Sequence, residues 1–207
     1  MRSVRGRRQP TTVRGELTKQ HLLTAAEQVF AQHGFAHGSV QDITRRAGVA
    51  LGTFYIYYPN KEALFLELVD TLGERLQRYV AAKTAPVGHG LERQRVAFRA
   101  FFEFAAQTPS LYRMVRQADL VDEAVYRAYY ERLAKAYADV LEQSMAEGSV
   151  TRFTPRVLAW VLMGIADFVG QRFVVWEDEP DVDAFLDEVV AFVEAGLTAK
   201  REPRRAG

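Results

Sequence analysis

The sequence predicts an all-α protein of about nine helices, and three observations lead to that prediction. Apolar residues recur every three or four positions along most of the 207 residues, which is the spacing of one helix face. Glycine and proline stand between these periodic segments, where helices commonly begin or end. No stretch shows the strict alternation of apolar and polar residues that a half-buried strand requires.

The first helix is expected to follow a basic N-terminal arm, residues 1–16, which we predict to be flexible. Thr18 can cap this helix, and residues 22–30 carry apolar side chains at helical spacing. Gly34 should end it, because glycine readily takes the left-handed conformation that follows many helix C-termini.

A second helix is predicted over residues 40–46. Ser39 precedes it, and Asp42 stands three positions after Ser39, which is the acidic form of a capping box. Gly48 should end this helix in a tight turn, and residues 52–57 can then form a short third helix.

Two short helices joined by a tight turn describe a helix-turn-helix, whose second helix enters the major groove of DNA. On that helix Phe54 and Tyr58 are four residues apart and are expected to face the protein interior. Tyr55 and Tyr57 lie on other faces, where their hydroxyls can reach phosphates or base edges. Pro59 should end the helix, because the residue before a proline is pushed out of helical geometry.

Asn60 should cap a long fourth helix, residues 61–83, whose leucines stand four apart. Residues 84–90 then form a linker, and residues 201–207 form a basic tail. Five further helices are predicted at residues 91–107, 110–117, 121–147, 155–176 and 182–200.

Charge is distributed unevenly along the chain. Residues 1–61 hold nine lysines and arginines against three acidic residues, a net charge of +6, whereas residues 62–207 have a net charge of −5. This asymmetry indicates that the basic N-terminal third binds a polyanion, whereas the acidic rest of the chain has a different function. The arginines of the N-terminal arm supply most of the difference, and either a minor-groove contact or a solvated tail accounts for them.

Composition argues against several classes of protein. Hydrophobic residues make up 48% of the chain, enough for a packed core, and the absence of cysteine excludes disulfides and thiolate metal sites. No apolar run reaches the roughly 18 uninterrupted residues of a membrane span. The basic N-terminus has no apolar region behind it and is therefore not a secretory signal. We expect a cytoplasmic protein with no membrane partner.

An enzyme is the alternative that the sequence supports least. None of the four histidines lies beyond the linker, and there is no metal-ligand cluster, nucleophile motif or phosphate-binding loop. Asp167, in an apolar helix, is better explained by a polar contact at a dimer seam or pocket. We therefore predict no catalytic residue, no metal and no cofactor.

A spaced set of residues across the helix-turn-helix is specific: Ile43, Ala47-Gly48-Val49, Gly52-Thr53, Tyr55, Tyr58 and Lys61-Glu62-Ala63-Leu64. Together with "LTKQHLLTAAEQVFAQHGF" before it, this set resembles the TetR family of transcriptional regulators over residues 18–68. Ala50 and Leu51 stand where the family usually has a hydroxyl residue and a lysine. Phosphate contacts at that turn would then move to backbone N–H groups or to the arginine-rich arm.

The resemblance implies which residues contact an operator in double-stranded DNA. They are Ser39, Val40 and Gln41 at the second helix, Ala50, Leu51, Gly52, Thr53, Tyr55, Ile56 and Tyr57 at the third, and Lys61 after it. Arg45 and Arg46 stand in the last turn of the second helix. Each can contact a phosphate, or can simply interact favourably with the helix dipole, and the sequence does not distinguish the two roles. The DNA-binding domain would occupy residues 17–61.

The resemblance further implies that residues 62–200 form a ligand-binding and dimerisation domain. The residues predicted to line its pocket are Phe101, Phe104, Tyr112, Arg113, Arg116, Tyr130, Trp160, Met163 and Phe168, although core packing or a solvated face explains each one taken singly. Residues 157–177 look like the equivalent stretch of TetR-type regulators that respond to acyl-CoA thioesters. We predict the dimer interface on the helices at 155–176 and 182–200.

These features predict a repressor that binds a (pseudo)palindromic operator as a homodimer and is released by an apolar effector, such as an acyl-CoA. The alternative is an activator, or a ligand-independent regulator, of the same fold.

Overall fold

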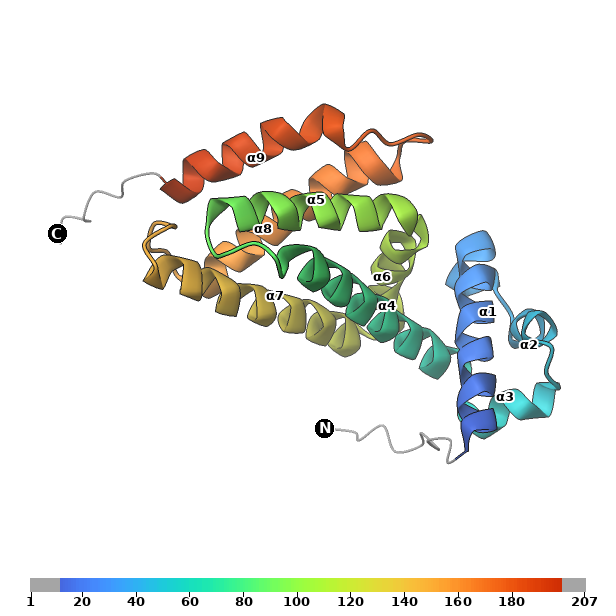
Figure 1. The fold of residues 1–207 in the computed structure, drawn as a ribbon. Coiled ribbons are helices and arrows are strands. Elements are labelled where there is room, and N and C mark those ends of the chain that lie inside the picture. The colour runs from blue at the N-terminus through green and yellow to red at the C-terminus, as the bar shows by residue number, and fades with distance from the viewer. Residues whose placement is uncertain (1–11, 199–207) are drawn as a thin grey trace. The chain divides into compact units, whose positions relative to one another are not determined.

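A computed structural model describes residues 12–198 of the chain, apart from the side chains of residues 110, 111 and 113. This part is all-α, with nine α-helices, one π-helical turn and no strand (Figure 1). The helices are α1 Val13–His37, α2 Val40–Ala47, α3 Leu51–Tyr57, α4 Lys61–Thr84, α5 Leu91–Gln107, α6 Pro109–Val121, α7 Glu123–Ala146, α8 Pro155–Gly170 and α9 Asp183–Thr198, with the π-turn η1 at Gln171–Val175. The predicted fold class is confirmed.

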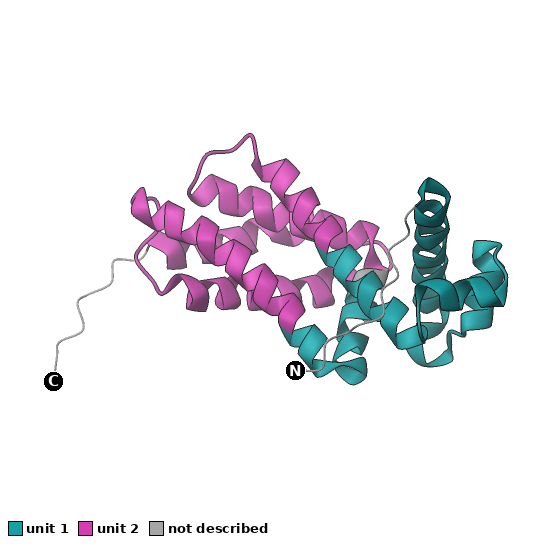
Figure 2. Ribbon diagram, turned by 90° about the horizontal axis from the view of Figure 1, so that it is seen from below, with its two compact units in different colours: residues 1–73, 110–127 teal, residues 74–109, 128–207 magenta. Residues whose placement is uncertain are grey.

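The chain divides into two compact units (Figure 2). The first takes the chain up to Gly73 together with Ser110–Arg127, and the second takes Glu74–Pro109 and the chain from Ala128 onward. The expected domain boundary after Lys61 therefore differs from the division in the structure. The first unit contains the first half of α4 and all of α6 except Pro109, so it is larger than a helix-turn-helix alone.

Helix α1 begins earlier than the sequence analysis expected. Its cap is Thr12, whose hydroxyl accepts a hydrogen bond from the Gly15 N–H at 3.2 Å. The expectation that Thr18 caps the helix is wrong, because its hydroxyl donates to the Arg14 carbonyl one turn earlier, at 2.9 Å. Residues 13–16, assigned to a flexible arm, are helical. Val13 is 80% exposed, so this extra turn buries little apolar surface and left no periodic signal.

Two glycines shape the end of α1. Gly34 has φ 73° and ψ 168°, so regular helical geometry stops there as expected, although one further turn follows before α2. A Cβ atom on Gly38 would lie 2.8 Å from Cδ1 of Phe30 and 2.9 Å from Cγ1 of Val29. Gly38 thus lets the chain pass closely over α1 on its way to α2.

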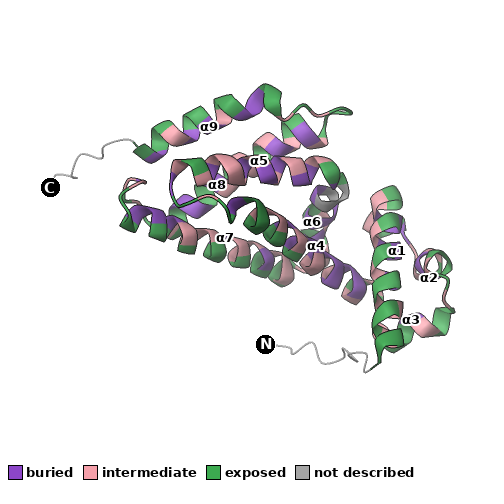
Figure 3. Cartoon of the chain, in the orientation of Figure 1, coloured by how far each residue is buried: buried purple, intermediate pink, exposed green. Residues whose placement is uncertain are grey.

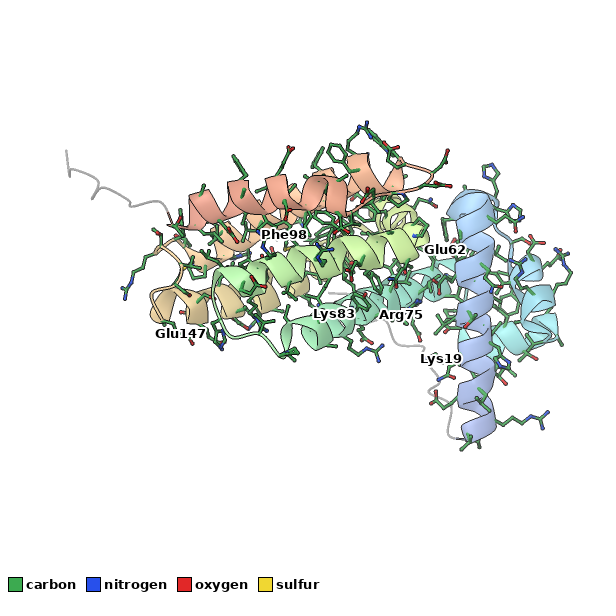
Figure 4. The ribbon with its side chains drawn as sticks, turned by 45° about the horizontal axis from the view of Figure 1, so that its top comes forward. Lys19, Glu62, Arg75, Lys83, Phe98 and Glu147 are labelled. Carbon is green, nitrogen blue, oxygen red and sulfur yellow. The ribbon has the colours of Figure 1, made fainter. Side chains whose placement is uncertain are left out.

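The core of the first unit is aromatic where α1 meets α4. The rings of Phe30, Phe35 and Phe65 lie 4.6–5.7 Å apart, and both Phe30 and Phe65 are buried. Beside them, Lys19 of α1 (labelled in Figure 4) forms a largely buried ion pair with Glu67 of α4 at 2.6 Å. These contacts hold α1 on the first half of α4. We call the three N-terminal helices, α1–α3, the head.

In the second unit α5 packs against α9. Arg95 and Arg99, one turn apart on α5, pair with Asp187 and Asp183 at 2.7 and 2.6 Å. Beneath these surface pairs, the ring of Phe102 meets that of Phe185 at 5.0 Å. Buried and exposed residues alternate along α9 (Figure 3), as expected for a helix that covers a core on one side.

The segment Pro155–Val175, α8 with η1, is the single described stretch long and apolar enough in composition to span a membrane. No such segment was predicted from the sequence, because Asp167 and Arg172 interrupt its apolar run. Of its 18-residue apolar window, 33% is buried within the chain. Several large apolar side chains of this segment are therefore exposed in a single copy.

Candidate nucleic-acid interface

The geometry of α2 and α3 follows from local chemistry at their ends. The Ser39 hydroxyl accepts a hydrogen bond from the Asp42 N–H at 3.1 Å and so caps α2. Gly48 ends α2 with φ 68°, and the Val49 N–H reaches back to the Thr44 carbonyl at 3.1 Å. Only three residues separate the two helices. The predicted helix-turn-helix is confirmed.

Helix α3 has one buried and one exposed face. Phe54 and Tyr58 are buried, as predicted, and their rings lie 5.7 Å apart. Ala50 precedes α3 and provides no side-chain cap, in keeping with the missing hydroxyl residue at that position. Tyr58 has extended geometry before Pro59 and ends the helix, as expected.

The residues predicted to contact DNA mostly reach solvent. Those that are exposed are Gln41, Arg45, Arg46, Ala50, Leu51, Gly52, Tyr55 and Ile56, and those of intermediate exposure are Ser39, Val40, Thr53, Tyr57 and Lys61. None of the thirteen is fully buried, so each keeps some surface available to a partner. Their contact with DNA stays a prediction.

Two of these residues already have partners at the start of α2. The Ser39 hydroxyl donates to the Asp42 carboxylate, and Arg45, three residues on from Asp42, forms an ion pair with that same carboxylate. The hydrogen bond from Ser39, followed by the one from Arg45, lowers the pKa of the Asp42 carboxyl below its ordinary value. Asp42 therefore stays ionised and holds the side chains of Ser39 and Arg45 in place at the start of α2.

Lys61, expected to contact a phosphate, is directed at the protein backbone. Its ammonium group donates to the carbonyl oxygens of Phe35 at 2.7 Å, Gly38 at 3.0 Å and Ala36 at 3.4 Å. It also lies 4.4 Å from the centre of the Phe35 ring. An ammonium has three N–H donors, and these three contacts use all of them. A phosphate would have to displace a carbonyl oxygen to bind Lys61.

Gln117 is a residue of this region whose contact the sequence analysis missed. It lies on α6, and its side-chain oxygen accepts a hydrogen bond from the Phe35 N–H at 2.7 Å, directly after the Gly34 turn. The two residues are 82 positions apart, so no local pattern indicated the contact. Lys61 and Gln117 thus hold the same short segment, residues 34–38, from two different helices of the first unit.

Replacing Lys61 with methionine should destabilise the head without removing a phosphate contact. Hydrogen bonds from a charged group contribute about 1.5–3 kcal/mol, so we expect the first unit to lose about 2 kcal/mol of unfolding free energy. Hydrogen exchange of residues 34–38 should speed up, and operator affinity should fall with an unchanged salt dependence. Lys83→Met, at an exposed lysine of α4 (Figure 4), is the control. A loss of about 0.9 in the log–log salt slope would instead place Lys61 on a phosphate.

The residues predicted for an effector pocket are distributed over both compact units, and their role in binding an effector stays a prediction. Within the second unit, Tyr130 stacks on Trp160 with ring centres 6.1 Å apart, and buried Phe104 packs against Tyr79 at 5.5 Å. Phe168 is 73% exposed. The others lie as follows: Phe101 and Met163 are of intermediate exposure, Tyr112 is buried on α6, Arg116 on α6 is exposed, and the Arg113 side chain lies outside the described residues.

One side-chain hydrogen bond in the second unit joins α5 to α7 and includes a buried amide. The Tyr137 hydroxyl of α7 donates to the side-chain oxygen of Gln94 of α5 at 2.6 Å, and Gln94 is 1% exposed. Burial raises the pKa of the Tyr137 phenol well above its ordinary value, so this hydroxyl stays protonated. Neither residue belonged to the predicted set, because nothing in the spacing of the sequence relates them.

Large apolar side chains are exposed on α8, on α9, and on and just after η1 in the second unit. We call them together the α8–α9 face; they are Val157, Trp160, Val161, Phe168, Phe173, Trp176 and Phe192. Counted from Val157, the members on α8 stand at positions i, i+3, i+4 and i+11, which places them in one stripe along the helix. Gly164 lies in that stripe, and a Cβ built there would meet no atom within 4 Å. A continuous apolar stripe of this kind is typical of a surface that another protein surface covers.

Comparison with known proteins agrees with this geometry. The family model for "Bacterial regulatory proteins, tetR family" matches residues 22–68, which run from α1 into α4. A Mycobacterium tuberculosis protein, provisionally named as the mycofactocin biosynthesis transcriptional regulator MftR, is 30% identical over 174 residues, covering 78% of this chain and 79% of its own. The chain belongs to the TetR family.

Two further proteins are similar to this chain over most of its length. The transcriptional activator FasR of Mycolicibacterium smegmatis is 26% identical over 196 residues, covering 94% of this chain and 87% of its own. The structure of FadR from Bacillus subtilis in complex with stearoyl-CoA has a TM-score of 0.74 at 21% identity and covers 86% of this chain and 98% of its own. This likeness shows that the two proteins share a fold.

As a TetR-family member, this chain is a DNA-binding transcriptional regulator. In a helix-turn-helix the second helix is the one that enters the major groove, and in this chain that helix is α3. Among the described residues, no group of three or more histidine and acidic side chains could hold a metal ion.

Proposed function

We propose that this TetR-family regulator is a repressor that binds a (pseudo)palindromic operator as a homodimer and is released by an apolar effector. The observation that carries the proposal is the combination of an exposed reading helix, α3, with an exposed apolar face on α8 and α9. The first feature suits DNA, and the second suits another copy of the chain.

A homodimer is supported by the α8–α9 face. Seven large apolar side chains remain exposed on it, and two helices packed against the same two helices of a second copy would bury them in a two-fold interface. Dimerisation would then present two copies of α3 to successive major grooves, about 34–36 Å apart. A shift in the separation of the two heads would weaken operator binding.

An apolar effector is supported by the chemistry of the second unit. Its interior is rich in phenylalanine and tyrosine, and the buried Gln94 side chain, hydrogen-bonded to Tyr137, supplies a polar group in it. Ligand sites commonly combine an apolar lining with a few placed polar groups of this kind. The FadR structure was determined with stearoyl-CoA, which makes a long-chain acyl-CoA the first effector to test here.

An activator is the second candidate. The relative FasR is named as a transcriptional activator, and it matches this chain over nearly its full length. The fold of the head is compatible with either outcome, because the sign of regulation depends on where the operator lies and on which state the effector stabilises.

The test is fluorescence anisotropy of the full-length chain with a labelled duplex taken from beside its own gene. We expect binding stronger than to a scrambled duplex, with a log–log salt slope of about −0.9 for each phosphate neutralised. Stearoyl-CoA should weaken that binding at least about tenfold, within the usual range of allosteric coupling. Coenzyme A without the acyl chain is the control and should leave binding unchanged.

Each other outcome identifies a different function. Stronger binding with stearoyl-CoA would contradict release and favour an effector-dependent activator or co-repressed regulator. Binding indifferent to stearoyl-CoA would overturn the effector class while leaving the DNA-binding role intact. Equal affinity for the gene-adjacent and scrambled duplexes would overturn specific binding at that site.

A further inference from the structure

The exposed face of α3 is apolar. We define it by four residues, Leu51, Gly52, Tyr55 and Ile56, which occupy neighbouring positions on one side of the helix. Leu51, Tyr55 and Ile56 are 44%, 56% and 55% exposed. None of the seven residues of α3 is charged. Apart from the phenol of Tyr55, this face presents no side-chain hydrogen-bonding group.

Packing within the chain does not account for this composition. The opposite face of α3 already buries Phe54 and Tyr58, so the core beneath the helix is filled by other residues. A Cβ built on Gly52 would meet no atom within 4 Å, so no contact of the described chain requires glycine there. Glycine inside a helix costs about 1 kcal/mol relative to alanine. The open space at Gly52 instead suits close approach by a partner.

The flanking charge identifies the class of partner. Arg45 and Arg46 end α2 beside the turn into α3, and both are exposed. Asp42 offsets part of the charge of Arg45, whereas Arg46 is followed by an uncharged stretch that runs to Lys61. An apolar surface with arginines at its border suits DNA, because the arginines can reach the phosphates that border a groove while the apolar side chains face the base edges.

The chemistry of the major groove indicates which base this face would contact. Guanine, cytosine and adenine present only hydrogen-bond donors and acceptors there, whereas thymine also presents a C5 methyl group. Leu51 and Ile56 have no side-chain donor or acceptor and cannot form bidentate hydrogen bonds to any base. The favourable contact open to them is with the thymine methyl group.

We propose that the exposed face of α3 recognises its operator through the C5 methyl groups of thymine, with Leu51 and Ile56 as the specificity-determining residues. The inference rests on the proposed DNA-binding function and names the base that α3 reads. Tyr55 lies between these two side chains on the same face, where its ring adds apolar surface. Gly52 leaves room for the base edge to approach the helix.

The experiment compares thymine with deoxyuridine, which pairs identically and lacks only the C5 methyl group. The probe is a duplex selected from a randomised library by the full-length chain. Each thymine of one half-site is replaced in turn by deoxyuridine, and affinity is measured by anisotropy at fixed salt. Because burial of one methyl contributes about 0.8 kcal/mol, we expect about a fourfold loss at each contacted position. Replacement outside the half-sites is the matched DNA control.

Protein variants assign the contacts. Ile56→Ala should bind the thymine duplex more weakly and should lose the discrimination against deoxyuridine at one position while keeping it at the others. Leu51→Ala should do the same at a different position. Leu120→Ala is the matched control, because Leu120 is 87% exposed on α6 of the same unit and away from the helix-turn-helix. It should keep both the affinity and every discrimination.

The outcomes separate this inference from the function on which it rests. Specific binding that changes by less than twofold with deoxyuridine at every half-site position would overturn methyl recognition and leave DNA binding standing. Discrimination that survives unchanged in both Leu51→Ala and Ile56→Ala would overturn the assignment to these residues. Failure of the selection to enrich any sequence would overturn both the inference and the proposed operator binding.

Discussion

Replacing Phe65 with alanine is expected to unfold the head of this regulator under conditions where the second unit stays folded. Phe65 is fully buried in α4, and its ring meets Phe35 at 4.6 Å and Phe30 at 5.4 Å. Removing a buried phenylalanine side chain costs about 3–5 kcal/mol, which is a large part of the stability of a small unit. The three-ring cluster between α1 and α4 would lose two of its three contacts.

Hydrogen exchange followed by mass spectrometry is the suitable measurement, because the two compact units need not unfold together. We expect fast exchange throughout α1–α3 in Phe65→Ala and little change in α5 and α9. Phe65→Leu is the control: it stays apolar and loses less volume, and such swaps usually cost less than about 1.5 kcal/mol. A loss below about 1 kcal/mol in Phe65→Ala would show that the cluster contributes little to the head.

The second large effect is expected at the α8–α9 face. Glutamate in place of both Phe168 and Phe192 should convert the proposed dimer to a monomer, since these two side chains are 73% and 72% exposed in one copy. Full burial of a phenylalanine contributes about 1.5–3 kcal/mol, and a two-fold interface loses each residue twice. The dimer dissociation constant should therefore rise at least about a hundredfold.

Size-exclusion chromatography with light scattering measures this directly, and operator affinity should fall in the same variant. Leu120→Glu makes the same kind of change at an exposed apolar residue of α6 and should leave the assembly intact. An unchanged molar mass in the Phe168 and Phe192 double variant would rule out this face as the dimer interface. A change in the circular dichroism of the double variant would instead indicate loss of α8 or α9.

The predictions that succeeded depended on chemistry within a few residues. Ser39, Gly48 and Pro59 set the ends of α2 and α3 through their own hydroxyl, positive φ and ring, so the helix-turn-helix could be located from the sequence. Asn60 likewise caps α4, where its side chain accepts a hydrogen bond from the Ala63 N–H at 2.8 Å. These capping signals involve only residues within one turn, so they could be located from the sequence, whereas Thr18 was assigned as a cap although Thr12 caps that helix.

The predictions that failed or stayed incomplete depended on distant partners or on burial. The Lys61 ammonium binds carbonyls 23 to 26 residues away, and Gln117 binds an amide 82 residues away. A lysine after a reading helix looks the same in sequence whether it faces a phosphate or the backbone. In the same way, Phe168 and Phe104 are both phenylalanines at helical spacing, and only the structure distinguishes the exposed one from the buried one.

The uncharged face of α3 also has a consequence for how such a regulator can change during evolution. Leu51, Gly52 and Ile56 are exposed and uncharged, so their replacement by other uncharged residues leaves both the core and the net charge of the head unchanged. The residues that would determine sequence specificity are thus different from the arginines that would provide non-specific affinity for DNA. A duplicated copy of this gene could acquire a new operator through a few substitutions in α3 while keeping its stability and its general affinity for DNA.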